Sequence, residues 1–343
     1  MVGIIGLSTV TLMETHFPPP RIAPLQGTSP RPFWSVMVPT YNRATYLERT
    51  LESVLSQDPG PDQMQIEVVD DASTVDDPEP LVRRVGGGRV SLFRRPRNLG
   101  LVGSWNGCID RARGEWVHIL HSDDVVYPGF YARFKGAVKA SDDVGAAFCR
   151  YVIMDENERW VYLSDLERDT PGILPDFIYK ICAFQRISTP TIVVRRSVYE
   201  NLGGYRLDLS FYADWEMWAR IAAHYPMWYE PEPLAAWRAH SGSKTAAVMK
   251  AIENVADGQR CLEHIRPLLP ADRAESTIRK ARERLALQAL DEAFWAWRER
   301  EYAVAFEQVW EGLKCKLSLR MIKALLLLPV RIAGGEVFRR HSK

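Results

Sequence analysis

The first part of the chain alternates short apolar runs with amphipathic segments of helical period. The apolar runs favour strands at 33–39, 66–71, 90–93 and 116–120, and the segments between them favour helices at 46–57, 78–84 and 102–112. Strands that alternate with helices at this spacing predict a mostly parallel α/β sheet with both faces covered.

Polar side chains follow two of these strands directly. Asp70 and Asp71 close the second strand, and Ser122, Asp123 and Asp124 follow the fourth. Ligands of open α/β sheets bind at the carboxyl ends of the strands. Adjacent carboxylates repel each other unless a cation offsets their charge, and a hard ion such as Mg²⁺ or Mn²⁺ does so. A helix cap or turn is the competing interpretation of each pair.

The pattern becomes purely helical towards the C-terminus. Beyond the first unit we expect a helix at 130–139, strands at 145–154 and 189–194, a helix at 195–202 and a short strand at 227–229; from residue 246 onward we expect helices at 260–269, 275–297 and 302–314. The last stretch, 317–340, is apolar and rich in Lys and Arg. It is either an interfacial membrane helix or a helix that packs on the rest of the protein, and both interpretations stay open.

Composition narrows the class of protein. The net charge of +1 gives no field that attracts nucleic acid. Five scattered cysteines without a Cys-x-x-Cys pair argue against a disulfide scaffold or zinc site and suit a reducing cytoplasm. Residues 1–32 lack a signal-peptide pattern and are expected to be a disordered leader. We therefore expect a cytoplasmic protein, peripheral on the inner face of the plasma membrane if its last helix is interfacial.

Several short motifs point to one family. They are Val38-Pro-Thr-Tyr-Asn-Arg, Val69-Asp-Asp-Ala-Ser, Asn98-Leu-Gly-Leu, Ala112-Arg-Gly-Glu, Leu120-His-Ser-Asp-Asp, Gly203-Gly-Tyr, Ala213-Asp-Trp-Glu-Met-Trp and Trp237-Arg-Ala-His. In this order and spacing they resemble a family 2 glycosyltransferase of the GT-A fold, over residues 33–245, with a C-terminal helical region at 246–343. The resemblance implies inverting transfer of a sugar from a nucleotide diphosphate donor to a saccharide or lipid-linked acceptor, in polysaccharide or glycolipid assembly.

The resemblance also assigns donor and metal roles. Asp124 matches the motif position that binds Mg²⁺ or Mn²⁺, and Asp123 would face the ribose or assist the metal. The sequence departs from the family at His121, where many relatives carry a further Asp. Asp71 matches the carboxylate that reads a uracil-type base, which favours a UDP or dTDP donor. Asp70 more simply stabilises the strand end. The remaining expected donor-binding residues are Pro39, Thr40, Tyr41, Arg43, Asn98 and Ser122.

The catalytic base and a further ligand come from the second half of the chain. Asp214 matches the family's general base, although an ordinary helix N-cap is a serious alternative. Relatives often carry an acid just before the base, but this chain has Ala213, so Glu216 is the fallback. His240 matches the histidine that reaches back to the metal or diphosphate. His118 and His224 are expected to be structural.

Other functions fit less well. A nucleotidyltransferase would carry a glycine-rich loop after the first strand, and a dinucleotide-binding oxidoreductase a Gly-x-Gly-x-x-Gly turn there; the chain has Pro39-Thr-Tyr-Asn-Arg. A non-catalytic sugar-binding relative would be expected to lose the metal or base carboxylate, yet both are present. The chain also lacks the Gln-x-x-Arg-Trp motif of processive polysaccharide synthases. This indicates that one sugar is added per event.

Overall fold

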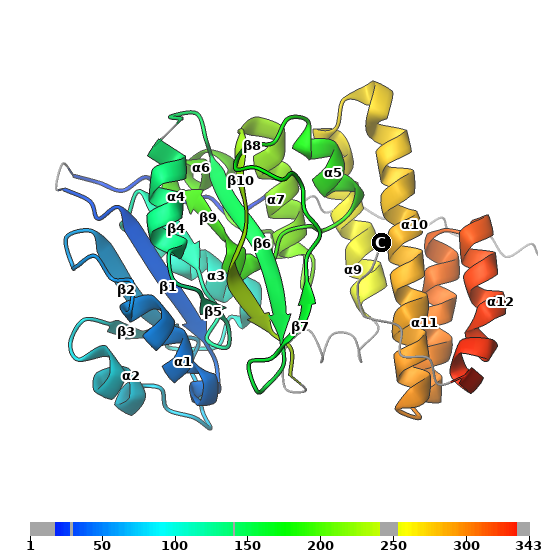
Figure 1. The fold of residues 1–343 in the computed structure, drawn as a ribbon, viewed down its shortest axis with the longest axis horizontal. Helices are drawn as coiled ribbons and strands as arrows, with labels where there is room; N and C mark the ends of the chain where they lie inside the picture. The colour runs from blue at the N-terminus through cyan, green and yellow to red at the C-terminus, as the bar shows by residue number, and fades with distance from the viewer. Residues whose placement is uncertain (1–17, 28–29, 140, 241–252, 335–343) are drawn as a thin grey trace, which may run out of the picture.

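In a computed structural model the protein is described at residues 18–27, 30–139, 141–240 and 253–334 (Figure 1). The strands are β1 (Trp34–Thr40), β2 (Met64–Asp70), β3 (Ser91–Arg94), β4 (Trp116–Ile119), β5 (Val125–Val126), β6 (Ala146–Met154), β7 (Trp160–Leu163), β8 (Gly172–Ile173), β9 (Ile192–Arg195) and β10 (Met227–Arg238). The α-helices are α1 (Ala44–Leu55), α2 (Glu79–Gly86), α3 (Gly100–Arg111), α4 (Phe130–Lys139), α5 (Phe177–Ala183), α6 (Arg196–Leu202), α7 (Ala213–His224), α9 (Glu253–Ile265), α10 (Ala271–Arg298), α11 (Tyr302–Cys315) and α12 (Leu319–Gly334). Short 3₁₀ turns occur at η1 (Thr189–Thr191) and η2 (Arg266–Leu268).

The strands form one mixed sheet in the order β3-β2-β1-β4-β9-β6-β10-β5, with β7 beside β6 and β8 beside β10. The first four strands of this order are parallel, as their alternation with helices predicts. The strand β9 is antiparallel to both β4 and β6, and β10 is parallel to β6. The carboxyl ends of β1, β2, β4 and β10 therefore point to the same edge of the sheet.

Helices cover both faces of the sheet. On one face α1, α2 and α4 pack over a core that includes Val36, Leu51 and Phe134. On the other face α3, α5, α6 and α7 share a core with α9 and α10, so the C-terminal helices extend this layer (Figure 1). A close backbone contact fixes the start of β4, because a Cβ at Gly114 would lie 2.6 Å from the backbone nitrogen of Ser35.

The expected leader is not disordered over its described part. Ile22 is buried in the core, the Pro20 carbonyl accepts a hydrogen bond from the Gly204 N–H at 2.7 Å, and the Ala23 carbonyl accepts one from Arg196 at 3.2 Å. One apolar side chain and two backbone carbonyls thus hold this segment against the sheet domain. Residues 1–17 lie outside the described part of the chain.

Most predicted elements lie where the apolar pattern put them, and the helix at 130–139 has the expected bounds. The strand expected at 189–194 begins as a 3₁₀ turn around Pro190. The strand expected at 227–229 continues to Arg238, and its register shifts around Pro233 let it pass two prolines.

Candidate active site

The loops after β1 and β2 are tied together by Asn42. Its side-chain oxygen accepts hydrogen bonds from the N–H groups of Thr74 at 2.8 Å and Val75 at 2.9 Å, and its own N–H donates to the Ser73 hydroxyl at 2.8 Å. The positive φ of 49° at Asn42 is a conformation that asparagine tolerates. These three hydrogen bonds hold the backbone of segment 39–43 in one conformation at the edge of the sheet.

The expected donor-binding residues of this segment differ in their surroundings. Tyr41 is 45% exposed, and the buried Thr40 hydroxyl has no hydrogen-bond partner among the described residues. Pro39 lies inside β1, paired with Val69, so the strand continues one residue past it. Arg43 contacts His240, its Nη1 lying 3.3 Å from Nδ1.

Asp71 lies directly after β2 and is buried. Its two carboxylate oxygens accept the Leu99 N–H at 3.0 and 3.1 Å, and Arg95 Nε lies 3.7 Å away. Burial raises the pKa of Asp71, against the opposing effects of the Leu99 N–H and the Arg95 charge. Asp70 is held by the Ser73 N–H at 3.0 Å and Arg94 at 2.8 Å, which is the strand-end role expected for it.

Two other expected donor-binding residues occupy turns. Asn98 Oδ1 accepts the Gly100 N–H at 2.8 Å, and Gly100 begins α3 with a φ of 74°, so Asn98 shapes the loop at this edge. Ser122 is buried in the turn that carries Asp123 and Asp124.

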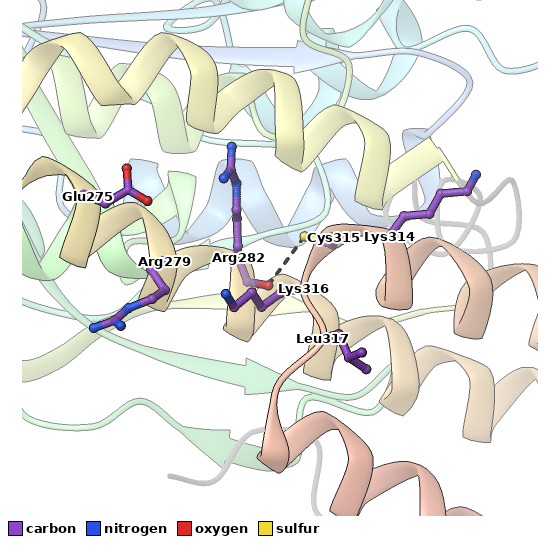
Figure 2. Close-up of a pocket in the computed structure, with 7 residues that line it drawn as sticks. All are labelled: Glu275, Arg279, Arg282, Lys314, Cys315, Lys316 and Leu317. Carbon is purple, nitrogen blue, oxygen red and sulfur yellow. Dashed lines mark hydrogen bonds between the residues drawn. The ribbon is translucent and has the colours of Figure 1, made fainter.

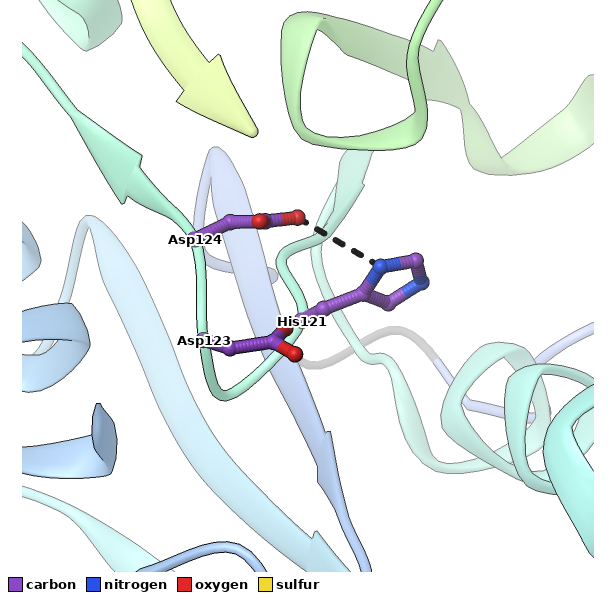
Figure 3. Close-up of side chains that lie close together, drawn as sticks. All are labelled: His121, Asp123 and Asp124. Carbon is purple, nitrogen blue, oxygen red and sulfur yellow. Dashed lines mark ion pairs between the residues drawn. The ribbon is translucent and has the colours of Figure 1, made fainter. Parts of the chain in front are cut away.

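A cluster of groups that could hold a metal ion lies after β4 (Figure 3). His121, Asp123 and Asp124 each place one ligand atom within 4.8 Å of the others. The Asp124 side chain is fully buried; Oδ1 accepts the Arg238 N–H at 3.0 Å, while Oδ2 has no hydrogen bond among the described residues and lies 3.4 Å from His121 Nδ1. Burial raises the pKa of Asp124 to about 6. A buried carboxylate oxygen that has only this long histidine contact among the described residues, beside a second carboxylate, suits a divalent cation.

Each of these two carboxylates faces a histidine. His121 Nε2 lies 2.9 Å from the Trp105 indole N–H, and the two rings stack with centroids 5.5 Å apart. Because an indole N–H only donates, His121 Nε2 accepts and the ring proton lies on Nδ1, towards Asp124. His121 was not predicted as part of the site; its position three residues before Asp124 was the available signal.

The position of the ring proton of His240, beside Asp123, can be assigned in the same way. Its Nε2 lies 3.0 Å from Asp123 Oδ2, and its Nδ1 faces the guanidinium of Arg43, which also only donates. His240 therefore donates to Asp123. Burial alone raises the pKa of Asp123, but the His240 hydrogen bond and the charges of His121 and Arg43 outweigh this and lower it. The contact joins the segments that follow β4 and β10, at positions that are 117 residues apart.

Asp214 lies in the first turn of α7 beside η1. Its Oδ1 accepts the Trp215 N–H at 2.7 Å, and the Thr189 hydroxyl donates to Oδ2 at 3.5 Å. Burial raises the pKa of Asp214 to about 6; the Trp215 N–H, the His121 charge, Gln185 and Thr189 oppose the rise. Asp214 and the cluster after β4 are thus close enough to interact. A carboxylate with a pKa near neutrality suits general-base chemistry.

The fallback residue Glu216 has a structural environment. Its side chain is 1% exposed and pairs with Arg220 at 2.8 Å and Arg206 at 3.2 Å. His118 and His224 are also structural. His118 is fully buried between the Tyr131 hydroxyl and the Pro190 carbonyl, and burial lowers its pKa to about 4; His224 hydrogen-bonds the Arg220 carbonyl.

Glu216→Gln is expected to lower the free energy of unfolding by about 3 kcal/mol, because the change leaves buried guanidinium charge without its partner. Urea unfolding measures this, with the exposed Glu307→Gln as control. A stable Glu216→Gln protein that binds nucleotide normally but has lost turnover would instead make Glu216 the base.

Comparison with known proteins shows which family this chain resembles. The model of the family described as glycosyl transferase family 2 matches residues 35–203. A Mycobacterium tuberculosis protein, MT1568, described only as uncharacterized, is 28% identical over 244 residues, which cover 68% of this chain and 75% of the relative.

Two solved structures have the same fold. S. aureus TarS aligns with a TM-score of 0.58 and 16% identity, over 88% of this chain and 52% of TarS, so this chain spans about half of that protein. The mannosyltransferase PcManGT from Pyrobaculum calidifontis, solved with GDP-Man and Mn²⁺, aligns with a TM-score of 0.52 and 22% identity over 90% of this chain and 88% of PcManGT. At these identities the likeness shows the fold alone.

Proposed function

Since this chain belongs to glycosyl transferase family 2 through residues 35–203, and is a glycosyltransferase of the GT-A fold, we propose that it is metal-dependent and inverting and transfers one sugar per event from a nucleotide diphosphate donor to a hydroxyl acceptor. The observation that carries this proposal is the pair of adjacent carboxylates of Asp123 and the fully buried Asp124, which lies close enough to Asp214 to interact with it through His121.

The metal would be held by the two carboxylates together with oxygens of the donor diphosphate. When bound, a Mg²⁺ or Mn²⁺ ion stabilises the negative charge of the departing nucleoside diphosphate. His121 and His240 donate to the carboxylates and orient them, as residues behind metal ligands commonly do. His240 thereby acts on the site through Asp123.

Asp214 would take the proton of the acceptor hydroxyl. As the acceptor oxygen bonds to the anomeric carbon, the bond from that carbon to the phosphate oxygen breaks, and the proton passes to an Asp214 oxygen. Attack from the face opposite the leaving diphosphate inverts the anomeric centre. The hydroxyl of Thr189 and the side chain of Gln185 hold the carboxylate in place.

The nucleotide would lie between the loop 39–43 and Asp71. Asp71 keeps free lone pairs after accepting the Leu99 N–H, so it can still accept the ring N–H of a uracil or thymine base. Pro39, Thr40 and Tyr41 would line the same edge, with Asn98 after β3 and Ser122 after β4 on either side of it. TarS residues 1–349, which align at a TM-score of 0.52 with 16% identity, were solved with UDP-GlcNAc, and PcManGT was solved with GDP-Man. Both ligands are nucleotide diphosphate sugars, the donor class that we propose here.

Calorimetric titration with UDP, dTDP and GDP, each with Mn²⁺ and with EDTA, tests this proposal. We expect UDP or dTDP to bind, and only with the metal present. Binding of UDP that is equal in EDTA would contradict the metal dependence. Failure of all three nucleotides to bind would point to a non-catalytic relative.

We also propose that α12 lies on a membrane surface, which suits a lipid-linked acceptor in glycolipid or polysaccharide assembly. The exposed large apolar side chains of this region are Leu317, Leu319, Ile322, Leu326 and Leu327. Beside Leu317 is a hollow of about 300 Å³ whose lining has more cations than acids (Figure 2). Its charged residues are Glu275, Arg279 and Arg282 of α10, Lys314 of α11 and Lys316 of the α11–α12 link. Apolar side chains next to cations fit an anionic phospholipid surface. Every helix in the described ranges is too short or too polar to span a bilayer.

Leu319→Glu combined with Leu326→Glu is expected to weaken binding to phosphatidylglycerol vesicles about a hundredfold, since two leucines contribute about 3 kcal/mol when buried. Flotation with vesicles measures this. The matched control is Val161→Glu with Leu166→Glu, which are also exposed but lie on the sheet domain. A wild-type protein that does not bind these vesicles would reject the membrane proposal.

A further inference from the structure

The segment that leads into the base-carrying helix α7 is held by a carboxylate from the C-terminal region. The side chain of Asp257 in α9 is fully buried. It accepts hydrogen bonds from three successive backbone N–H groups, those of Ser210 at 3.0 Å, Phe211 at 2.8 Å and Tyr212 at 2.8 Å. Arg260 donates a further hydrogen bond to it at 2.9 Å. A buried carboxylate that accepts this many hydrogen bonds holds the backbone of Ser210, Phe211 and Tyr212 in place.

Asp257 takes the place of a side-chain N-cap, which α7 lacks. Tyr212, the residue before the helix, gives no side-chain hydrogen bond to the first turn. A negative charge near a helix N-terminus stabilises that end. Asp257 supplies such a charge from α9. The last N–H group that it accepts, that of Tyr212, lies two residues before Asp214. The direction in which α7 begins, and with it the place of the Asp214 carboxylate, therefore depends on α9.

Three other contacts hold the same segment. His264 of α9 lies 2.7 Å from Asp208, the Cys261 thiol donates to the Tyr212 carbonyl at 3.6 Å, and the Tyr212 hydroxyl donates to Gln288 of α10 at 3.2 Å. A Cβ at Gly258 would lie 3.1 Å from the Tyr212 ring and 2.9 Å from Leu285, so α9 approaches the segment closely at its glycine. The segment 208–212 is thus clamped along its length by α9 and α10.

We propose that Asp257 is a positioning residue for the glycosyl transfer, which holds segment 208–212 so that Asp214 meets the acceptor hydroxyl. This rests on the proposed role of Asp214 as the base. It makes the C-terminal helical region part of the catalytic unit, because the residue that orients the base comes from α9, which follows the last strand of the sheet along the chain. A shift of about 1 Å in a reacting group costs on the order of a hundredfold in rate, so a loosened segment is expected to reduce turnover strongly.

The test is a double-mutant cycle of Asp257→Asn and Asp214→Asn in the full-length protein. The rate is the release of nucleoside diphosphate from UDP-glucose, UDP-N-acetylglucosamine, dTDP-glucose or GDP-mannose, with octyl glycosides as acceptors. We expect Asp257→Asn alone to lower kcat about tenfold or more, with Mn²⁺-dependent nucleotide affinity unchanged. In the Asp214→Asn background the same change is expected to matter by less than about twofold, because there is no base left to position.

The control is Glu263→Gln, an exposed acid on the same helix, which is expected to keep wild-type kcat in both backgrounds. If Asp257→Asn does not fold, as thermal unfolding will show, His264→Gln releases the other end of the segment and is expected to give a smaller loss of kcat that also disappears without Asp214. A loss from Asp257→Asn, or from His264→Gln in its place, that is equal in both backgrounds overturns the positioning role alone. Wild-type turnover in Asp214→Asn overturns the base assignment itself.

Discussion

Asp124→Asn abolishes metal-dependent nucleotide binding if the proposed site is correct. An amide has the shape of the carboxylate but not its charge. Among the described residues the buried Oδ2 has only the 3.4 Å contact with His121 Nδ1. Loss of a residue that only supports a metal ligand already costs ten- to a hundredfold in metal affinity, so loss of the ligand is expected to cost at least about a hundredfold. Calorimetric titration of UDP in the presence of Mn²⁺ measures the effect.

The exposed Asp143→Asn, which makes the same chemical change on the surface, is the matched control and is expected to bind like wild type. The variant also separates the two carboxylates. Asp123 Oδ2 is hydrogen-bonded to His240 at 3.0 Å, whereas Asp124 Oδ2 has only a longer contact of 3.4 Å with His121 among the described residues. Undiminished UDP affinity with Mn²⁺ in Asp124→Asn would move the metal away from this turn.

Asp214→Asn is expected to lower turnover by about a hundredfold or more while leaving nucleotide binding intact, because a general base contributes about that much and acts only in the chemical step. In the wild type, the pKa of Asp214, raised by burial to about 6, makes the base deprotonated above pH 6 and protonated below it. The rate is therefore expected to fall as the pH drops through about 6. Steady-state kinetics across pH 5 to 8 check this.

The pH dependence gives a second, independent check on the same residue. The acid limb near pH 6 is expected to be missing from the residual activity of Asp214→Asn. An unchanged limb in that variant would assign it to another group, with Asp124 the next in line because its pKa is also about 6. Near-wild-type turnover in Asp214→Asn would leave the aspartate with the helix-start role that its Trp215 N–H contact describes.

The apolar pattern predicted the strands and helices that are buried on a regular period. It found α1, α4 and the strands β1, β2 and β4, because each of these buries a continuous run or one helical face. It missed β7, whose Trp160 and Val161 are more than half exposed, and the two-residue β8. These strands exist because β6 and β10 offer them hydrogen-bonding edges, which is information from elsewhere in the chain.

The site divides in the same way. Asp123, Asp124 and Asp214 were predicted as candidates because their motifs are local and follow recognisable elements. The surroundings that decide between their possible roles are not local. The contacts His240–Asp123 and Asp257–Phe211 join positions 117 and 46 residues apart, and His121 gains its orientation from Trp105 on another element. Periodicity along a chain carries no signal for pairs of this kind.

The bridge that Asn42 makes between the loops after β1 and β2 has a consequence for how a nucleotide is captured. Three hydrogen bonds join these loops within the protein itself, with no ligand taking part. Ordering a free loop on binding would cost about 1–2 kcal/mol of backbone entropy for each residue fixed. Here these loops are already ordered when the protein folds, so the nucleotide binds to a site whose backbone conformation is formed in advance. Association is then expected to be a single kinetic step, without a slow phase of loop closure.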